Sequence, residues 1–274
     1  MKIKRVVYIG YNFLSSCLHR ILRRDDCEVL LCLTGRLHEN VSNIVQICES
    51  YAIPVHFGKP NGSTVKNILS LEPDLIICAA YAYRVPVEKL QGIPCINVHP
   101  SLLPIGRGYD PMPYLLSTER EHAGVSIHEM TPEFDTGDIL DQDPIAITEQ
   151  TTMEQLALMI FDKAPLLLER VLDDFENKWN NRRPQGEGSY FPVYSQKEME
   201  IDARTCTVDQ AADIIRRFGY LGLTVRTQQG EINGCAGHVV RSETVRKPGV
   251  VVMNSHSVKY ISLVDGLLML RAFI

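Results

Sequence analysis

The chain has 274 residues, with 28 Lys and Arg against 33 Asp and Glu, so its formal net charge is −5. Apolar residues make up 45% and charged residues 22% of it, both near the averages for globular domains, which excludes a disordered or fibrous chain. The acidic balance argues against a general nucleic-acid binder. Apolar runs fall short of the ~20 residues of a membrane helix, and the N-terminus is typical of a first strand and not of a signal peptide.

The eight cysteines contain no C-x-x-C pair, and several lie inside apolar runs, where Cys behaves as a small hydrophobe. This pattern predicts a cytoplasmic protein with reduced thiols, no disulfide framework and no metal site.

The first half of the chain alternates apolar runs with helical patterns. The runs predict strands over residues 4–9, 27–33, 54–57, 75–79 and 94–98, and helical periodicity predicts helices over residues 13–23, 43–51, 64–71 and 85–90. This alternation predicts an α/β fold with a doubly wound, mostly parallel sheet, which binds ligands beyond the carboxyl ends of its strands. A single glycine, Gly10, follows the first strand, so we expect no NAD-type site.

The second half changes character twice. Strands are predicted over residues 124–130 and 139–147, followed by a long helix over residues 151–175, where Thr151 or Thr152 can form a capping box with Glu154 or Gln155. The polar stretch 180–188, with one Pro and two Gly, is the best linker candidate. A helix over 208–218 then precedes predicted strands over residues 224–227, 238–242, 249–253, 258–262 and 267–273. We expect domains over residues 1–180 and 189–274, the second small and β-rich.

Three chemically useful side chains are predicted to meet at one sheet edge. Asn97 and His99 lie two residues apart at a strand end and therefore share a face, and Asp135 follows in a Gly-containing loop. An amide donor, an imidazole and a carboxylate suit acyl transfer without a covalent enzyme intermediate. The sequence has no G-x-S-x-G elbow, which disfavours a nucleophilic hydrolase. Each residue alone also has a structural explanation, as a loop-packing histidine, a strand-end cap or a plain turn.

Residues 97–104, 107–108, 124–130 and 135–139 form an ordered set that resembles the signature of the N10-formyltetrahydrofolate-dependent formyltransferases. The resemblance covers roughly residues 1–175. It implies a Rossmann-like formyltransferase domain, N10-formyltetrahydrofolate as the formyl donor, a primary amine as acceptor and no metal. It also implies that Asn97, His99 and Asp135 are the catalytic residues.

The resemblance further implies a pterin site made largely of backbone groups. Its expected residues are Ala80, Tyr81, Ala82, Tyr83, Arg84, Thr136, Gly137 and Asp138. The expected acceptor-binding residues are Ser101, Arg107, Gly108, Tyr109, His128, Tyr190 and Phe191. Tyr190 or Phe191 could stack on a base or pack under the linker, and Arg107, Arg182 and Arg183 could contact phosphates or remain solvated charges.

Three branches of the family compete. Glycinamide-ribonucleotide formyltransferases resemble the first domain only. Methionyl-tRNA formyltransferases have a similar second domain but are longer, and they need a basic surface, which the acidic chain and its short turn at residues 35–39 do not offer. Enzymes that formylate nucleotide-linked amino sugars are close in length and share His128. We therefore expect a UDP- or dTDP-linked amino-deoxysugar as substrate, in surface glycan biosynthesis such as that of lipopolysaccharide.

Two alternatives remain beside this expectation. One is a methionyl-tRNA formyltransferase, and the other is a catalytically silent module that binds folate or a nucleotide sugar. The apolar late strands could also expose an edge that pairs with a second copy, which leaves a homodimer open.

Overall fold

A computed structural model describes residues 5–272 except 38, 91 and 244–246. The chain forms two compact units. Unit 1 comprises Met1–Pro111, Glu121–Ala146 and Ala157–Phe191, and unit 2 comprises Met112–Arg120, Ile147–Leu156 and Pro192–Ile274. No helix among the described residues has the length and apolar character needed to cross a membrane.

Unit 1 is built on a sheet whose described strands follow the order β3-β2-β1-β4-β5-β7-β8. Their bounds are β1 (Arg5–Gly10), β2 (Glu28–Thr34), β3 (Val55–Phe57), β4 (Leu75–Ala79), β5 (Cys95–His99), β7 (Gly124–Glu129) and β8 (Ile139–Pro144). Strands β1 to β5 pair in parallel, whereas β7 and β8 are antiparallel to their neighbours. The predicted mostly parallel sheet is thus confirmed, and its chain order reverses between β1 and β4.

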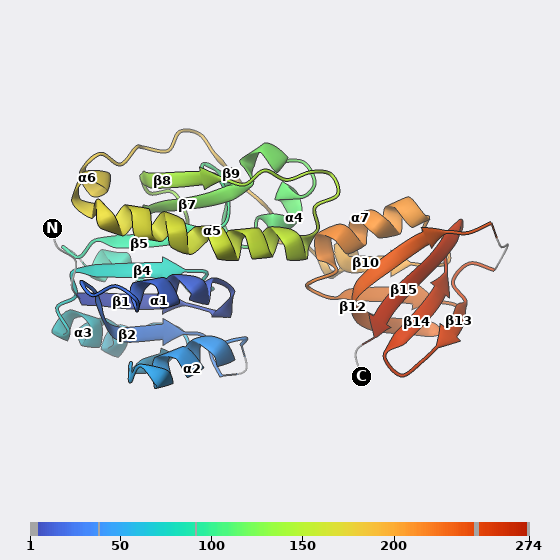
Figure 1. The fold of residues 1–274 in the computed structure, drawn as a ribbon, viewed down its shortest axis with the longest axis horizontal. Coiled ribbons are helices and arrows are strands. Elements are labelled where there is room, and N and C mark those ends of the chain that lie inside the picture. Colours follow the sequence, from blue (N-terminus) through green and yellow to red (C-terminus); the bar gives the residue numbers. More distant parts are fainter. Residues whose placement is uncertain (1–4, 38, 91, 244–246, 273–274) are drawn as a thin grey trace. The chain divides into compact units, whose positions relative to one another are not determined.

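Helices cover both faces of this sheet (Figure 1). Helices α1 (Ser15–Ile21) and α5 (Met153–Asp173) lie side by side, with the Ser16 hydroxyl donating to the Phe161 carbonyl at 2.8 Å. On the other face, Val65 and Ile68 of α3 (Gly62–Ser70) join the buried core formed by alternate residues of β1, β2 and β4. The remaining helices of this unit are α2 (Ser42–Ser50) and α6 (Phe175–Asn180). The doubly wound α/β fold is confirmed.

Several local predictions need correction. The predicted helix 85–90 is a single 3₁₀ turn over Val87–Lys89, because Pro86 donates no backbone hydrogen bond and fixes its own φ. No element was predicted between residues 98 and 124, but this stretch contains a short strand, β6 (Ile105–Arg107), and a helix, α4 (Met112–Leu115). Strand β6 pairs with β9 (Ser189–Tyr190), a partner 84 residues away at Ile105↔Ser189 that local patterns could not indicate.

The long helix begins as predicted. The Thr152 backbone N–H donates to the Gln155 side-chain oxygen at 3.0 Å, and the Gln155 N–H donates to the Thr152 hydroxyl at 3.3 Å. This reciprocal pair is the predicted capping box, and it satisfies two of the N–H groups that a helix start leaves unpaired.

Unit 2 contains a second sheet, with the described order β10-β11-β12-β15-β14-β13, and helix α7 (Val208–Phe218), whose bounds match the prediction. Its strands are β10 (Glu200–Asp202), β11 (Leu223–Thr227), β12 (Gly230–Arg241), β13 (Val251–Asn254), β14 (Val258–Ser262) and β15 (Gly266–Ala272). Strand β12 starts eight residues before the predicted strand 238–242, because Gly234 and Gly237 interrupt the apolar alternation on which the prediction relied. The predicted strand end at residue 273 lies outside the described residues.

Candidate active site

Strands β5 and β7 and the loop before β8 bring four polar side chains together at one edge of the unit 1 sheet. Asn97 lies opposite His128 in the antiparallel β5–β7 ladder, and His99 ends β5 two residues further on. Asp135 enters from the loop between β7 and β8. The structure thus brings Asn97, His99 and Asp135 together as expected and adds the imidazole of His128 to them.

Asp135 is the centre of this cluster. Its Oδ1 accepts from the Asn97 amide nitrogen at 3.1 Å and lies 3.3 Å from His128 Nε2. Its Oδ2 accepts from the Gly108 backbone N–H at 2.9 Å and lies 3.6 Å from His99 Nδ1. Only 8% of the residue is exposed. A carboxylate surrounded by donors from three separate segments is held in one orientation.

The surroundings of Asp135 also fix its charge. Burial by itself raises the pKa of this carboxyl, but the nearby histidines, the hydrogen bond with His128 and the Gly108 N–H outweigh burial and hold the pKa below its ordinary value. Asp135 is therefore anionic at neutral pH, and its negative charge faces His99.

The two nitrogens of His99 have different partners. Nε2 lies 2.7 Å from the Gly106 carbonyl oxygen, which can only accept, so this nitrogen carries a proton in the neutral ring. Nδ1 then has the lone pair and faces Asp135. Burial lowers the pKa of His99 and the neighbouring His128 adds to that effect, while Asp135 opposes it. The ring is thus neutral at pH 7 and can take up a proton at Nδ1 beside a carboxylate.

His128 and Ser101, both expected to bind the acceptor, are buried at the sheet edge. His128 is 1% exposed, with Nδ1 2.7 Å from the Glu129 carbonyl oxygen and Nε2 3.1 Å from the Asn97 amide nitrogen. Ser101 is fully buried, and its hydroxyl donates to the Ile105 carbonyl at 2.7 Å. Both side chains therefore have protein partners in this structure, and their expected part in acceptor binding stays a prediction.

The segments expected to hold the pterin lie on two loops that contact each other. After β4 the chain turns at Ala80, whose φ is 54°, and Arg84 Nε then donates to the Pro132 carbonyl at 3.1 Å in the loop that carries Asp135. In this loop, a Cβ added to Gly137 would lie 2.0 Å from the Glu129 carbonyl oxygen. Segments 80–84 and 136–138 thus lie on two main-chain turns that contact each other at the carboxyl edge of the sheet, and their expected part in holding a pterin stays a prediction.

Tyr109 and Tyr190 are the exposed members of the predicted acceptor set, at 59% and 52%. The Arg107 guanidinium lies 6.0 Å from the Tyr190 ring centroid. Phe191 is half-buried, and a Cβ added to Gly106 would lie 2.9 Å from its ring. The two tyrosines therefore offer aromatic surface near the cluster, whereas Phe191 packs against the chain.

The arginines considered for phosphate contacts already have protein partners. Arg107 donates through Nε and Nη2 to the Gln185 side-chain oxygen at 3.1 and 2.9 Å. Arg182 Nε pairs with Glu129 at 2.8 Å, Arg183 Nη2 donates to the Gln142 side-chain oxygen at 3.5 Å, and the Arg183 backbone N–H donates to the Ile139 carbonyl at 2.9 Å. Segment 182–190, which includes part of the predicted linker, is thus tied to unit 1. Sequence reasoning missed Gln185, because nothing distinguishes it within a polar stretch.

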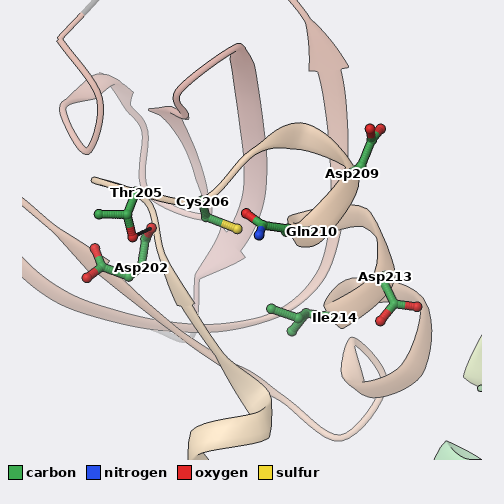
Figure 2. Close-up of a pocket in the computed structure, with 7 residues that line it drawn as sticks. All are labelled: Asp202, Thr205, Cys206, Asp209, Gln210, Asp213 and Ile214. Carbon is green, nitrogen blue, oxygen red and sulfur yellow. Dashed lines mark hydrogen bonds between the residues drawn. The ribbon is translucent and has the colours of Figure 1, made fainter.

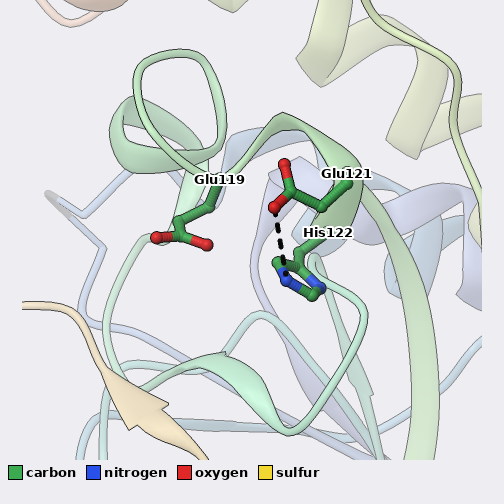
Figure 3. Close-up of side chains that lie close together, drawn as sticks. All are labelled: Glu119, Glu121 and His122. Carbon is green, nitrogen blue, oxygen red and sulfur yellow. Dashed lines mark ion pairs between the residues drawn. The ribbon is translucent and has the colours of Figure 1, made fainter.

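Two other groups of polar residues lie outside this cluster. Unit 2 has a hollow of about 790 Å³ around the start of α7. Figure 2 shows residues that line it, among them Asp202, Cys206 and Asp213. Figure 3 shows His122 beside Glu121, with Nε2 and Oε1 3.8 Å apart and the carboxylate 71% exposed. An ion pair this exposed is a surface contact of low energetic weight.

The fold and the cluster define an enzyme of the acyl-transfer class. Residues 42–172 match the family model described as Formyl transferase. The chain is 32% identical over 269 residues to the methionyl-tRNA formyltransferase of Bacillus mycoides (strain KBAB4), covering 90% of the chain and 83% of that protein. It is 34% identical over 228 residues to the methionyl-tRNA formyltransferase of Ehrlichia canis (strain Jake), covering 78% and 72%. The chain belongs to the formyl transferase family, which confirms the predicted formyltetrahydrofolate-dependent enzyme.

Solved structures show the same fold at lower identity. HypX from Aquifex aeolicus in complex with tetrahydrofolic acid superposes with a TM-score of 0.74 at 18% identity, covering 98% of this chain and 44% of that longer one. The N-formyltransferase from Helicobacter canadensis, in complex with folinic acid and dTDP-3-aminofucose, superposes with a TM-score of 0.65 at 17% identity, covering 99% and 100%.

Proposed function

We propose that this chain transfers the formyl group of N10-formyltetrahydrofolate to a primary amine, with Asn97, His99 and Asp135 as its catalytic residues. The observation that carries the proposal is the buried Asp135 carboxylate, which lies 3.1 Å from the Asn97 amide nitrogen and 3.6 Å from His99 Nδ1. The folate supplies the formyl carbon when bound, and residues 80–84 and 136–138 would hold its pterin ring.

Each residue has a role that its contacts support. Asn97 carries the amide N–H groups that can stabilise negative charge on the carbonyl oxygen during acyl transfer. His99, neutral and with its lone pair on Nδ1, can accept the proton that the attacking amine loses. Asp135 then faces the imidazolium and stabilises its charge, which is how a carboxylate assists a histidine base.

For the acceptor, we propose the amino group of methionyl-tRNA. The support is the 32% identity to the Bacillus mycoides enzyme, which extends over 269 residues and so over both units. The nine basic and six acidic residues of segment 201–274 give it a net charge of +3, against −8 for the rest of the chain. A positive second unit suits contact with phosphates. On this support we propose methionyl-tRNA as the acceptor in preference to the amino sugar that the sequence patterns favoured.

A nucleotide-linked amino sugar is the second candidate, for a specific reason. Strand β2 ends at Thr34 and α2 begins at Ser42, so the connection between them is too short for a long cationic arm. The exposed Tyr109 and Tyr190 could stack on a nucleobase. The Helicobacter canadensis enzyme, whose full length this chain matches, was solved with dTDP-3-aminofucose.

One assay separates these acceptors. Release of tetrahydrofolate is followed by absorbance with methionyl-tRNA, or with UDP- and dTDP-linked amino sugars, as the amine. Uncharged tRNA and N-acetylated sugars serve as controls, because they lack the free amine. We expect turnover with methionyl-tRNA. Turnover with a sugar nucleotide and none with methionyl-tRNA would show that the proposed acceptor is wrong. Folate binding without turnover on any amine would favour a catalytically silent binding module.

A further inference from the structure

Segment 182–190 packs against the candidate active site over its whole length. Arg183 exchanges two backbone hydrogen bonds with Ile139 at the start of β8, at 2.8 and 2.9 Å. At the other end, Ser189 and Tyr190 form β9 beside β6, and the Tyr190 hydroxyl donates to the Phe134 carbonyl at 2.8 Å. The segment therefore pairs with the start of β8, which follows the Asp135 loop, and with β6, which precedes Gly108.

Gln185, in the middle of this segment, binds the backbone of the Asp135 loop through its side chain. Its side-chain nitrogen donates to the carbonyl oxygen of Asp135 at 3.0 Å and to that of Gly137 at 2.6 Å. Its side-chain oxygen accepts from two nitrogens of Arg107, at 3.1 and 2.9 Å. The Gln185 amide thus donates both of its N–H groups to the Asp135 loop, and its oxygen accepts from Arg107 of β6.

The Asp135 backbone needs such support. Its φ is 56°, in the left-handed region, which is unfavourable for a residue other than glycine and persists only where the surroundings impose it. The carboxylate enters the cluster because the backbone is held in this conformation. The two carbonyl groups that Gln185 binds belong to Asp135 itself and to the residue two positions later.

The Gly108 N–H donates to the Asp135 carboxylate at 2.9 Å, and Arg107 is the residue before it. Gln185 therefore contacts the chain on both sides of this hydrogen bond, through the Asp135 backbone and through the Arg107 side chain. Loss of its amide would free the two stretches to move apart, and the carboxylate would leave His99.

We propose that Gln185 is a positioning residue, which holds the Asp135 loop so that the carboxylate faces Asn97 and His99. The inference rests on the proposed catalytic role of Asp135. The hydrogen bonds of the Gln185 side chain go to the backbone of the Asp135 loop and to Arg107, and not to the side chains of Asn97, His99 or Asp135.

Two variants test the proposal. Gln185→Met keeps the length of the side chain and removes its donors and acceptor. Gln185→Glu keeps an acceptor for Arg107 and removes both N–H groups that bind the loop. Gln210→Met is the matched control, since it removes a glutamine that caps α7 in unit 2. Circular dichroism and thermal unfolding establish that each variant is folded.

We expect both Gln185 variants to lower kcat by about tenfold or more, because small displacements of a catalytic group reduce rates strongly. The decisive readout is the imidazole titration of His99 by NMR. Because Asp135 raises the pKa of His99, a displaced carboxylate lets that pKa fall further. A variant that only lowers the stability of the protein would leave the His99 titration of the folded protein unchanged, and we expect this result for Gln210→Met.

An unchanged His99 titration in folded Gln185→Met protein would overturn the proposal, whether or not the rate falls. Wild-type-like kcat in folded Gln185→Glu protein would overturn it as well. If the wild type turned over no acceptor while the His99 titration still moved in the Gln185 variants, the proposed function would fail and the positioning role would stand.

Discussion

Units 1 and 2 each gather carboxylates beside polar side chains, but they do so in opposite ways. In the unit 2 hollow, Asp209 pairs with Arg241 at 2.6 Å, and its side chain is 77% exposed. Asp213 pairs with Arg216 at 2.7 Å and is 47% exposed. In unit 1, Asp135 is 8% exposed and is surrounded by an amide, a backbone N–H and two imidazoles.

This difference in burial distinguishes a surface hollow from a candidate active site. The hollow in unit 2 is large, at about 790 Å³, yet its acidic groups reach solvent and each is paired with an arginine. The unit 1 cluster holds the buried Asp135 anion beside the neutral ring of His99, so a proton can be taken up at His99 Nδ1 next to the carboxylate. Perturbed pKa values caused by burial and specific partners mark functional sites better than volume does.

The largest effect is expected from removing the functional side chains of the unit 1 cluster. Asn97→Ala and His99→Ala are each expected to lower turnover by at least tenfold, and Asn97→Ala by about 10²–10³ if its amide binds the developing oxyanion. The reason is that the charge in the transition state loses its donor or its base. Steady-state tetrahydrofolate release measures the effect. Near-normal rates in both folded variants would remove the assignment of this cluster.

A second test compares two glycines of unit 1. A Cβ on Gly137 would lie 2.0 Å from the Glu129 carbonyl oxygen, whereas nothing lies within 4 Å of one on Gly62. We expect Gly137→Ala to lower the free energy of unfolding by about 1–3 kcal/mol and Gly62→Ala to change it little. Urea unfolding followed by fluorescence of Trp179, the single tryptophan of the chain, reports on unit 1. Equal stabilities would show that the Asp135 loop is loosely packed.

The charges of His99 and Asp135 make the stability of the protein depend on pH. The pKa values of His99 and Asp135 are both lowered in the folded protein, so the unfolded chain binds more protons in acid. Stability contributed by His99 is therefore complete above its ordinary pKa of about 6.5 and is lost as the pH falls below it. Asp135→Asn should lower the pKa of His99 further in an NMR titration. A rise in that pKa would contradict the proposed pairing.

The smallest effect is expected in unit 2. Asp209→Asn breaks an ion pair with Arg241 whose side chains are 77% and 61% exposed, and such a pair contributes within about 1 kcal/mol. Turnover should stay at the wild-type level, because Asp209 has no part in the cluster. Calorimetry and the tetrahydrofolate assay measure the two quantities, and a large loss of activity would make the hollow part of the site.

Sequence patterns were sufficient for the main features of unit 1. The strand periodicity and the spacing of Asn97 and His99 placed both residues at the sheet edge, and the loop motif placed Asp135 near them. The contacts of His128 could not be predicted, because they depend on the β5–β7 register, which pairs residues 31 positions apart.

Long-range contacts also account for the role that was missed. Gln185 lies in a stretch whose composition is typical of a linker, and its partners are about 50 and 78 residues away in sequence. Short strands such as β6 and β9 have no periodicity to detect, since they exist only through pairing with each other. The resemblance to a family supplied a catalytic hypothesis but could not supply the network that holds it.

Formyl transfer at this cluster depends on the buried carboxylate of Asp135, and Asp135→Asn tests that role most directly. The measurement is the rate of tetrahydrofolate release from N10-formyltetrahydrofolate with the acceptor that the wild type uses, compared with wild type and Asp209→Asn at the same pH. We predict a fall of at least tenfold for Asp135→Asn and no change for Asp209→Asn. Folded Asp135→Asn protein with a wild-type rate would contradict formyl transfer at this cluster.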